Sequence, residues 1–504
     1  MRTLTLLLLF ISCCARLPEP SKKELTYSFD SSPKTKIYQS IHKELVAHPE
    51  LNGFYPLGDG EDALAARLAA VLEAERTLDL QYYIWHDDET GRALLKQILT
   101  AADRGVRVRL LLDDLNEGKH DKGLLILDSH PFIEVRLANP FAHRKARVME
   151  AFRFSQVNRR MHNKVFIADN QIGIFGGRNI GDEYFGASDD MNFGDFDLWS
   201  IGPLVKELSE EFDTYWNSDV AFPVAQLSQE KITKEDMEKF HEKSILDQKK
   251  VKTDKYAERV LSHHLIEKFL DKDFKLYWGK ARAFYDSPEK LNPDEKTKLL
   301  ADDLRTNLNA ANKELILISP YFVPGKKGMK TFKELRRKEV DTWVLTNSLA
   351  SNDVTTVFSG YRKYRRPLIK KGVHLYELMP RSNRQEKDKS SIGSSATSGL
   401  HGKLIVFDQK KVVVGSMNLD PRSKNLNTEM GIVVDSPEMA RDISQKVKTI
   451  VKEDAYRVIL KGDDLRWEAL KDDKKIKYDK EPETTWWKRF KANLSAIFVP
   501  EKLL

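Results

Sequence analysis

The chain has 504 residues, of which 41% are hydrophobic, 32% charged and 10% aromatic. This composition excludes a wholly disordered chain, a collagen-like chain and a protein built mainly of membrane spans, and the length suits about two to four globular domains. The formal net charge of +7 comes from 83 basic and 76 acidic residues. Such a modest excess permits binding to an anionic surface, but it gives little support to a groove for nucleic acid.

The N-terminus carries a candidate targeting segment. Both cysteines, Cys13 and Cys14, lie there, so the folded body has neither a disulfide framework nor a thiolate metal site. The apolar run at residues 4–11 is too short to span a bilayer and is typical of an export signal. Residues 11–13 are similar to a bacterial lipoprotein processing site, although Phe10 stands where Leu is usual. A lipidated Cys13, an uncleaved anchor and a plain signal peptide remain open.

The first half of the chain alternates predicted helices and strands. Residues 63–74 are rich in Ala and Leu with helical periodicity, and residues 76–85 are typical of a strand. A helix is predicted over 91–103, and strands over 106–112 and 133–137. Strand, helix and strand in this order predict a right-handed crossover between parallel strands.

The second half repeats this order of elements. Its pattern predicts a strand over 314–323, a helix over 326–338, and strands over 340–346 and 373–378. We therefore predict an internal duplication. The Ser-, Gly- and charge-rich segment 381–398 is typical of a mobile loop, which is a candidate lid or an inert surface loop.

These observations divide the chain into five parts. A charged segment separates the two similar halves, and an apolar stripe at helical spacing, with basic residues beside it, ends the chain. This stripe fits either a membrane interface or a terminal helix docked on the core. The predicted parts are a signal or lipoprotein-like N-terminus (1–20), an N-terminal domain (40–225), a charged linker or helix (226–262), a C-terminal domain (263–470) and an amphipathic tail (480–504).

Two segments share one skeleton of polar residues, and every interval within it is identical between them. The pairs are His162 and His401, Lys164 and Lys403, Asp169 and Asp408, and Asn179 and Asn418. One His-x-Lys-x4-Asp motif alone is weak evidence. Two copies, each extended to an Asn at the same distance and each placed after a matching series of strands, make chance an implausible explanation.

The spacing has a geometric interpretation, which the first copy illustrates. Residues 165–168 are an apolar strand, so His162 and the Lys two residues later share a face. If residues 170–171 form a two-residue hairpin turn, the register places His162 opposite Asn179. Each motif then presents His, Lys and Asn together. Asp169 falls at the end of the hairpin, where a structural role is at least as well supported as a catalytic one.

That group of residues suits phosphodiester chemistry without a metal. A ring nitrogen can attack phosphorus, while ammonium and amide donors hold the negative oxygens of the transition state. Two copies matter because one imidazole must start neutral to attack and the other must start protonated to donate to the leaving oxygen. Each imidazole also needs an acid on its other nitrogen, and Asp197 and Glu429 lie downstream of the two motifs in segments that look like matching strands.

The paired motif resembles that of the phospholipase D superfamily. Flanking segments 80–86, 176–182 and 319–325 are similar to those of bacterial cardiolipin synthases of the C type. The resemblance implies an α/β fold of two duplicated phospholipase D-like α/β/α sandwich domains, with pseudo-twofold symmetry and one shared active site. It also implies a two-step mechanism through phosphohistidine.

The resemblance implies a role for each residue of the motifs. His162 corresponds to the nucleophile and His401 to the general acid and later base. Gly177 departs from the usual Ser, so the hydroxyl available at Ser416 is absent from the first copy. The expected catalytic set is His162, Lys164, Asp169, His401, Lys403 and Asp408, with Asn179, Asn418 and Ser416 at the phosphate and Asp197 and Glu429 orienting the histidines.

The function implied is that of a phosphatidyltransferase. It would form cardiolipin from phosphatidylglycerol and a donor phospholipid, for which the C-type resemblance suggests phosphatidylethanolamine. The alternative is a phospholipase D that uses water as acceptor and releases phosphatidic acid. No cofactor, metal or nucleic acid is expected. The expected partners are a phospholipid membrane and an accessory membrane protein, and the expected location is the exported side of a bacterial cell membrane, peripheral or lipid-anchored.

Overall fold

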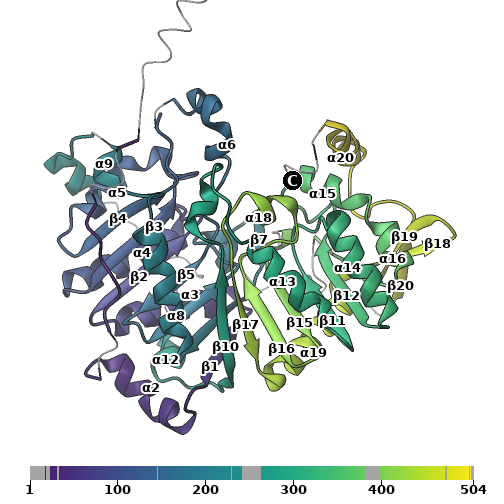
Figure 1. Ribbon diagram of the computed structural model, residues 1–504, viewed down its shortest axis with the longest axis horizontal. Helices are drawn as coiled ribbons and strands as arrows, with labels where there is room; N and C mark the ends of the chain where they lie inside the picture. The colour runs from purple at the N-terminus through teal and green to yellow at the C-terminus, as the bar shows by residue number, and fades with distance from the viewer. Residues whose placement is uncertain are drawn as a thin grey trace, which may run out of the picture.

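The protein consists of two α/β halves that lie side by side (Figure 1). The structure is a computed structural model. It describes residues 17–18, 23–30, 33–144, 146–228, 230–240, 263–380, 397–471, 474–498 and 500. The predicted targeting segment at 1–16, most of the predicted charged linker (241–262) and most of the candidate lid (381–396) lie outside the described residues.

The N-terminal half is built on a mixed sheet with the strand order β1-β8-β6-β5-β2-β3-β4-β9. Strands β2, β3 and β4 are parallel, as the crossover pattern predicts, and the others pair antiparallel. The strands are β1 (Asn52–Leu57), β2 (Thr77–Tyr82), β3 (Arg107–Asp113), β4 (Ile133–Ala138), β5 (Val165–Ala168), β6 (Ile172–Gly176), β8 (Asp197–Ile201) and β9 (Ala221–Pro223).

The C-terminal half repeats this sheet. Its order is β10-β17-β16-β15-β11-β12-β13-β18, again with three parallel strands in the middle, and β19 and β20 extend its far edge. The strands are β10 (Tyr277–Tyr285), β11 (Glu314–Ile318), β12 (Asp341–Asn347), β13 (His374–Leu378), β15 (Leu404–Phe407), β16 (Lys411–Gly415), β17 (Met430–Asp435), β18 (Ala455–Lys461), β19 (Asp464–Lys471) and β20 (Lys474–Tyr478).

Two pairings join the halves. Strand β1 pairs antiparallel with β10, which makes the two sheets continuous. A separate two-stranded sheet pairs β7 (Met191–Gly194) of the first half with β14 (Thr397–Leu400) of the second. Because β7 and β14 lie next to the acid of one half and the His of the other, this small sheet brings residues from both halves to one place.

The helices cover the sheets and fill the space between them. In the N-terminal half they are α2 (Lys36–Ala47), α3 (Gly60–Glu73), α4 (Glu89–Asp103), α5 (Asp121–Asp128), α6 (Phe154–Val157), α7 (Asp182–Phe185), α8 (Leu204–Trp216) and α9 (Val224–Leu227), with 3-10 turns η2 (Glu117–Lys119) and η3 (Arg147–Arg153). In the C-terminal half they are α12 (His263–Leu270), η4 (Pro288–Leu291), α13 (Leu300–Asn309), α14 (Gly325–Arg337), α15 (Thr355–Arg362), α16 (Arg365–Lys370), α18 (Pro421–Asn425), α19 (Pro437–Glu453) and α20 (Trp486–Phe498).

The core follows from the alternation of side chains along the buried strands. On β3, Leu110 and Leu112 face a cluster with α3 and α4, whereas Leu111 faces the other way. Leu111 belongs to a second cluster that contains α8, α19 and strands of both sheets. The two halves therefore share a hydrophobic core, and the position of the two motifs relative to each other is fixed by burial of apolar surface.

The predicted elements are present, with boundaries displaced by a few residues. The largest difference is in the strand predicted over 314–323, because β11 ends at Ile318. Pro320 has no N–H to donate to a sheet ladder. Beyond it, Phe322 makes a single isolated bridge with Leu419 rather than continuing the strand.

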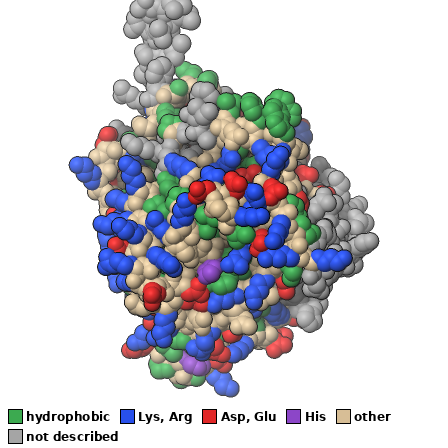
Figure 2. Space-filling view, turned by 90° about the vertical axis from the view of Figure 1, so that its right-hand side faces the viewer, with side chains coloured by type: hydrophobic (Ala, Val, Ile, Leu, Met, Phe, Trp, Pro, Cys, Tyr) green, Lys and Arg blue, Asp and Glu red, His purple; other side chains and the backbone are tan. Residues whose placement is uncertain are grey.

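The predicted amphipathic tail is the helix α20, which both docks on the protein and exposes apolar side chains. It packs against α15, and Ala492 on its inner side is fully buried. Outward, Trp486, Trp487, Phe490 and Leu494 are 59%, 63%, 41% and 44% exposed. Figure 2 shows hydrophobic side chains gathered at the top of this end of the molecule, above a face rich in Lys and Arg. Among the described residues, no helix has the length and apolar character needed to cross a bilayer.

Candidate active site

The two motifs meet where the halves join, and backbone hydrogen bonds hold them there. The N–H of His162 donates to the carbonyl of Thr428 (3.0 Å), and the N–H of Thr428 donates to the carbonyl of Arg160 (3.0 Å). In the other motif, the N–H of His401 donates to the carbonyl of Gly194 (2.9 Å). The segment before each His thus pairs with the segment before an acid of the opposite half.

Each histidine is hydrogen-bonded to an acid of the other half. Nδ1 of His162 lies 2.8 Å from Oε2 of Glu429, and Nδ1 of His401 lies 2.6 Å from Oδ2 of Asp195. All four side chains are buried. An acid on Nδ1 fixes the orientation of the ring and leaves Nε2 as the nitrogen for chemistry. The site is complete only when both halves are present.

Asp197, the expected partner of a histidine, lies elsewhere. Its carboxylate pairs with Arg67 (2.8 Å) and accepts the backbone N–H of Arg178 (3.1 Å). Asp195, two residues earlier, is the acid of the first half that contacts a histidine, and that histidine is His401 of the second half. The prediction of Asp197 as an orienting acid was therefore wrong, whereas Glu429 does contact a histidine, that of the opposite motif.

The sheet register explains the error. Gly176 pairs with Asp197, and at the corresponding place in the second half Gly415 pairs with Gly431. Asp197 therefore corresponds to Gly431, and the residue two positions earlier corresponds to Glu429. The alternation of apolar residues along β8 and β17 carries this signal, because Leu198 and Ile432 come into register only when Asp195 is aligned with Glu429.

The difference between Gly177 and Ser416 also has a structural reason. Ser416 Oγ donates to Oε2 of Glu429 (2.5 Å) and accepts the N–H of Met430 (3.0 Å). In the first half, a Cβ on Gly177 would lie only 2.1 Å from Oδ1 of Asp195. The carboxylate of Asp195 fills the space that a serine side chain would need. The first motif therefore has Gly177 where the second has Ser416, because Asp195 leaves no room for a larger residue.

The two lysines lie beside the histidines. Lys403 Nζ is 3.0 Å from Nδ1 and 3.2 Å from Nε2 of His401. Lys164 Nζ donates to the backbone carbonyl of His162 (2.6 Å). Both ammonium groups are buried, and burial lowers the pKa of each, with that of Lys164 lowered further by the charge of Lys403. Two buried cations whose charges affect each other favour an anionic ligand in the same site.

The two asparagines differ in their partners. Nδ2 of Asn179 donates to the hydroxyl of Tyr184 (2.9 Å), and its Oδ1 accepts the N–H of Ile84 (3.3 Å). Oδ1 of Asn418 is buried and has no hydrogen-bond partner among the described residues. An unpaired buried polar atom is costly unless a ligand satisfies it. Asn418 is therefore the member of the pair that is open to substrate.

Asp169 and Asp408, which the sequence analysis placed in the catalytic set, lie away from the histidines. Asp169 accepts the backbone N–H groups of residues 75–77 at 2.7 to 3.3 Å, and Asp408 accepts those of residues 312–314 at 2.7 to 3.1 Å. Seven residues of extended chain separate each of them from its histidine, which corresponds to about 20 Å. These contacts tie the hairpin to the start of β2 or β11, so neither carboxylate is at the reacting centre.

The hairpin turn that contains Asp169 also differs from the prediction. Ala168 pairs with Ile172, so three residues link β5 to β6 rather than the two predicted at 170–171. Asp169 and Asn170 both have positive φ, at 52° and 54°. Asp and Asn tolerate this conformation better than most residues do. The ladder register is shifted by one, and His162 is not directly opposite Asn179.

The two histidine–acid pairs differ electrostatically. Burial and the charges of Lys164 and Lys403 hold the pKa of His162 well below its usual value. The pKa of His401 is also lowered by burial and Lys403, but Asp195 opposes that shift. Burial alone would raise the pKa of Asp195, yet the charge and hydrogen bond of His401 keep it below its usual range.

Glu429 shows the opposite behaviour to Asp195. Burial raises the pKa of Glu429 to about 7, and the charge of Lys164 and the hydrogen bond from Ser416 offset only part of that effect. In the first pair, the low pKa of His162 favours the neutral imidazole, and the raised pKa of Glu429 favours the protonated acid. The second pair holds a histidine beside a firmly ionised acid, which favours the imidazolium.

Aromatic rings line the histidines. The ring of Tyr83 meets that of His162 edge-on with centroids 4.8 Å apart, and the rings of Tyr184 and Phe193 lie 5.2 and 5.3 Å from His401. The sequence analysis did not single out these three aromatic residues. No spacing rule marks them. Tyr184 on α7 lies five residues after Asn179, where the second half has Ser423 on α18, and Phe193 lies on β7, a strand with no counterpart in the described chain between α18 and β17.

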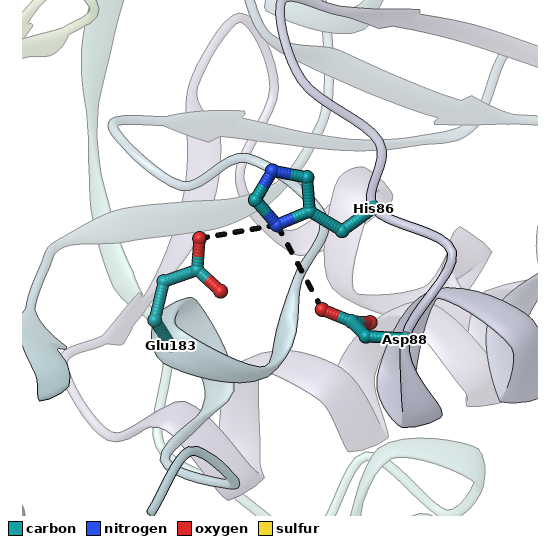
Figure 3. A group of neighbouring side chains, drawn as sticks. All are labelled: His86, Asp88 and Glu183. Carbon is teal, nitrogen blue, oxygen red and sulfur yellow. Dashed lines mark ion pairs between the residues drawn. The ribbon is translucent and has the colours of Figure 1, made fainter. Parts of the chain in front are cut away.

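A separate cluster joins His86, Asp88 and Glu183 (Figure 3). Nδ1 of His86 is 3.2 Å from Oε1 of Glu183 and 3.8 Å from Oδ2 of Asp88. Ligand atoms of all three lie within 4.8 Å of one another, so these half-buried residues could hold a cation. The hydrogen bond to Glu183 raises the pKa of His86, and Asp88 also caps α4 through the N–H of Gly91 (3.0 Å). A histidine–carboxylate ion pair accounts for this geometry.

A family model and individual known proteins match this chain and agree on one family. A family model described as "Cardiolipin synthase, PLD-like domain" matches the chain at residues 68–216 and 304–451. The chain is 40% identical over 462 residues to cardiolipin synthase C of Escherichia coli, covering 91% of this chain and 97% of that protein. It is 26% identical over 381 residues to cardiolipin synthase of Geobacillus kaustophilus, covering 74% of this chain and 61% of that protein.

A solved structure shares the fold. Phosphatidylserine synthase of Haemophilus influenzae superposes with a TM-score of 0.56 at 12% identity, covering 92% of this chain and all of that one (100%). The double family match and this likeness confirm the predicted duplication of a phospholipase D-like α/β/α domain. The two matched ranges contain both motifs and both acids that contact the histidines.

Proposed function

This chain belongs to the family of cardiolipin synthases with phospholipase D-like domains, and from that premise we propose that it forms cardiolipin from phosphatidylglycerol and a donor phospholipid through a phosphohistidine intermediate. It is a phosphatidyltransferase of the phospholipase D type, and its substrates are phospholipids. The observation that carries the proposal is the crosswise pairing of His162 with Glu429 and of His401 with Asp195 in one buried site.

His162 is the nucleophile in this proposal. Attack on phosphorus needs a neutral imidazole, and the low pKa that burial and the two lysines give His162 supplies one at neutral pH. Glu429 holds Nδ1, so the lone pair of Nε2 is available for attack. His401 beside ionised Asp195 is the better general acid, because a carboxylate stabilises the imidazolium that carries the proton to be donated.

The reaction takes two steps. Nε2 of His162 forms a bond to the donor phosphorus, the bond from phosphorus to the headgroup oxygen breaks, and His401 gives that oxygen its proton. The primary hydroxyl of phosphatidylglycerol then gives its proton to His401 and attacks the phosphohistidine, which releases His162 and completes cardiolipin. Lys164 and Lys403 stabilise the phosphoryl oxygens in both steps, and Oδ1 of Asn418 is placed to accept a hydrogen bond from a substrate hydroxyl.

Transfer to an alcohol is favoured over hydrolysis by the burial of the site. His162 is 6% and His401 7% exposed, with aromatic rings against both. A site that excludes water protects the intermediate from hydrolysis until an alcohol arrives. Phosphatidylethanolamine is the proposed donor, and the 40% identity to cardiolipin synthase C of Escherichia coli, together with the C-type flanking segments, supports this choice.

The protein acts at a bacterial membrane, and α20 supports a peripheral mode of binding. In Figure 1, α6 of the N-terminal half and α20 of the C-terminal half project from the same edge of the molecule. Phe154 on α6 is 56% exposed, and the exposed Trp486 and Trp487 begin α20. Trp side chains favour the interface between water and lipid. We place this edge against the membrane on its exported side, with a lipidated Cys13 and an accessory membrane protein as further proposals.

The decisive experiment measures products. Purified protein is incubated with vesicles containing labelled phosphatidylglycerol, with and without phosphatidylethanolamine, and the lipids are separated. The proposal expects cardiolipin, mainly when phosphatidylethanolamine is present, and no cardiolipin from H162A. If phosphatidic acid is the only product, whether labelled or not, water is the acceptor. Formation of cardiolipin by H162A would contradict the mechanism.

A further inference from the structure

A cavity of about 270 Å³ lies between α13, α14 and α18 in the C-terminal half, three helices that are adjacent in Figure 1. Its volume is close to the low end of the range for small-molecule sites, which is roughly 300 Å³. Most of its wall is apolar. The apolar side chains include Leu304, Leu308, Phe322, Phe332, Leu335 and Met417.

The cavity reaches the second motif. Met417, which lies between Ser416 and Asn418, lines it, and so does Leu419. A smaller cavity of about 40 Å³ shares Leu304, Met417 and Leu419 as walls and extends to Lys403 beside His401. The two cavities therefore share the walls formed by Met417 and Leu419, the two neighbours of Asn418 in the chain.

Four cations and one acid line the same cavity, and burial raises the pKa of the acid, Asp420, to about 7. The cations are Arg305, Lys326, Lys327 and Lys424. Lys424 is half-buried, and among the described residues it forms no ion pair with an acid. Burial and the charge of Lys327 lower the pKa of Lys424. Arg305 contacts Asp302 at 3.2 Å on an exposed surface, where such a pair is weak and can be exchanged for another anion. Like charges gathered beside an apolar cavity disfavour each other unless an anion lies between them.

An apolar cavity whose lining holds four cations and one acid matches one kind of molecule, an anionic lipid. The apolar wall suits part of an acyl chain, and the cations suit a phosphodiester. We propose that this cavity binds the acceptor phospholipid, with one acyl chain inside it and its unreacted phosphodiester at Arg305, Lys327 and Lys424. This inference rests on the proposed function, and it assigns the acceptor a site of its own.

Transfer chemistry requires such a second anion site. The donor phosphate reacts at His162 between Lys164 and Lys403, but phosphatidylglycerol brings a second phosphate that stays intact while its glycerol hydroxyl attacks. Two phosphodiesters close together repel each other unless separate cations hold them. Water, the acceptor in hydrolysis, has neither a phosphate nor an acyl chain, so the cavity affects transfer and leaves hydrolysis unchanged.

The test uses the full chain and vesicles in which the mole fraction of phosphatidylglycerol is varied against phosphatidylethanolamine. The double variant K327Q/K424Q should make cardiolipin about ten-fold more slowly at low phosphatidylglycerol, as loss of charged hydrogen bonds predicts. Its rate should recover as phosphatidylglycerol rises, and its release of phosphatidic acid should be unchanged, which also shows that the variant is folded. K333Q, an exposed lysine of α14 outside the cavity, is the matched control.

A second variant tests the apolar wall. L308W should fill part of the cavity and raise the apparent KM for long-chain phosphatidylglycerol more than for a short-chain one. If K327Q/K424Q and K333Q have the same acceptor dependence while the unaltered protein makes cardiolipin, the acceptor site is wrong and the proposed function stands. If the unaltered protein releases only phosphatidic acid, both are wrong.

Discussion

His162 and Glu429 are 267 residues apart in the chain, yet Nδ1 of His162 lies 2.8 Å from Oε2 of Glu429 in a buried hydrogen bond. The corresponding bond from His401 to Asp195 crosses between the halves in the opposite direction. Neither half can orient its own histidine. Because the acids are exchanged, the geometry of the nucleophile depends on the packing of the two halves and not on the first motif alone.

This exchange predicts that the two acids affect different chemical steps. D195N should lower cardiolipin formation by about 10²- to 10⁴-fold, because His401 loses the carboxylate that stabilises its protonated form. A donor whose leaving group is p-nitrophenol needs no proton on departure, so it should restore formation of the intermediate in D195N. E429Q acts on the nucleophile, and the same donor should not restore it. The measurement is the burst of p-nitrophenol release in each variant.

The outcome has a clear control. H401A should respond to the p-nitrophenol donor as D195N does, and H162A should release no burst with any donor. If the p-nitrophenol donor restores the burst in E429Q but not in D195N, the assignment of nucleophile and general acid must be reversed. Equal restoration of both would show that the acids do not divide between the two steps.

A second prediction concerns the glycine of the first motif. A Cβ at position 177 would meet Oδ1 of Asp195 at 2.1 Å, so G177A should displace the carboxylate from His401. We expect a loss of transfer activity of about 10²-fold, the scale of a misplaced orienting group. S416G removes a single hydroxyl that donates to Glu429 and should cost less, about ten-fold. Steady-state transfer rates of both variants provide the comparison, and a larger loss in S416G would contradict the argument.

Sequence reasoning found most of the fold because its signals are local. Apolar alternation and helical spacing predicted β2, β3, β4 and their counterparts in the second half, and identical intervals located the histidines and lysines. It assigned Asp197 in place of Asp195 because two acids flank one residue and only the register of β8 against β6 separates them. The crosswise pairing could not be predicted, since it depends on how β7 and β14 pair across the halves.

A third prediction separates stability from catalysis at Asp169. Its carboxylate accepts three consecutive backbone N–H groups and lies about seven residues from His162 along the strand. D169A should lower the free energy of unfolding by about 1–3 kcal/mol, since it leaves three backbone donors, of which that of Thr77 is buried, without this acceptor. At a temperature where the variant is fully folded, its turnover per folded molecule should match the unaltered protein. Thermal unfolding followed by circular dichroism, together with transfer rates at low temperature, checks both parts.

The same reasoning applies to Asp408, which holds residues 312–314. D408A should also leave turnover unchanged, but it should cost less stability than D169A, because its hydrogen bonds are more exposed. A folded D169A or D408A protein that had lost transfer activity by several orders of magnitude would return these carboxylates to the catalytic set.

A fourth prediction concerns Glu211, a fully buried acid on α8 that contacts Asn163, the residue next to His162. Its Oε1 accepts Nδ2 of Asn163 at 2.6 Å, and Asn163 in turn accepts the hydroxyl of Thr428 (3.2 Å). Burial raises the pKa of Glu211 from 4.5 to about 8. Since this folded-state pKa exceeds the unfolded value, the stabilising contribution is complete below pH 4.5 and is lost as pH rises through about 8.

E211Q keeps the size and neutral charge of the protonated glutamate side chain, but it cannot ionise. Relative to the unaltered protein, it should gain roughly 1.4 kcal/mol of stability per pH unit between about pH 6 and 8. E210Q, an exposed neighbour on the same helix, should show no such trend. Urea unfolding at a series of pH values measures the difference, and parallel pH dependences of E211Q and the unaltered protein would show that Glu211 is ionised in the fold.

The last prediction tests the membrane edge. Trp486 and Trp487 are 59% and 63% exposed on α20, whereas Trp199 and Trp216 are buried. If α20 enters the lipid interface, vesicles with brominated acyl chains should quench the two exposed indoles and shift their emission to shorter wavelength. W486F/W487F should lose most of that quenching. The effect is specific to α20, because the signal comes from the two indoles and not from binding of the whole protein.

The control variant is F132A. It removes an exposed aromatic side chain (44%) just before β4, at the opposite end of the parallel strands from the active site, and it should leave the quenching unchanged. Quenching that persists in W486F/W487F would place a different surface against the bilayer.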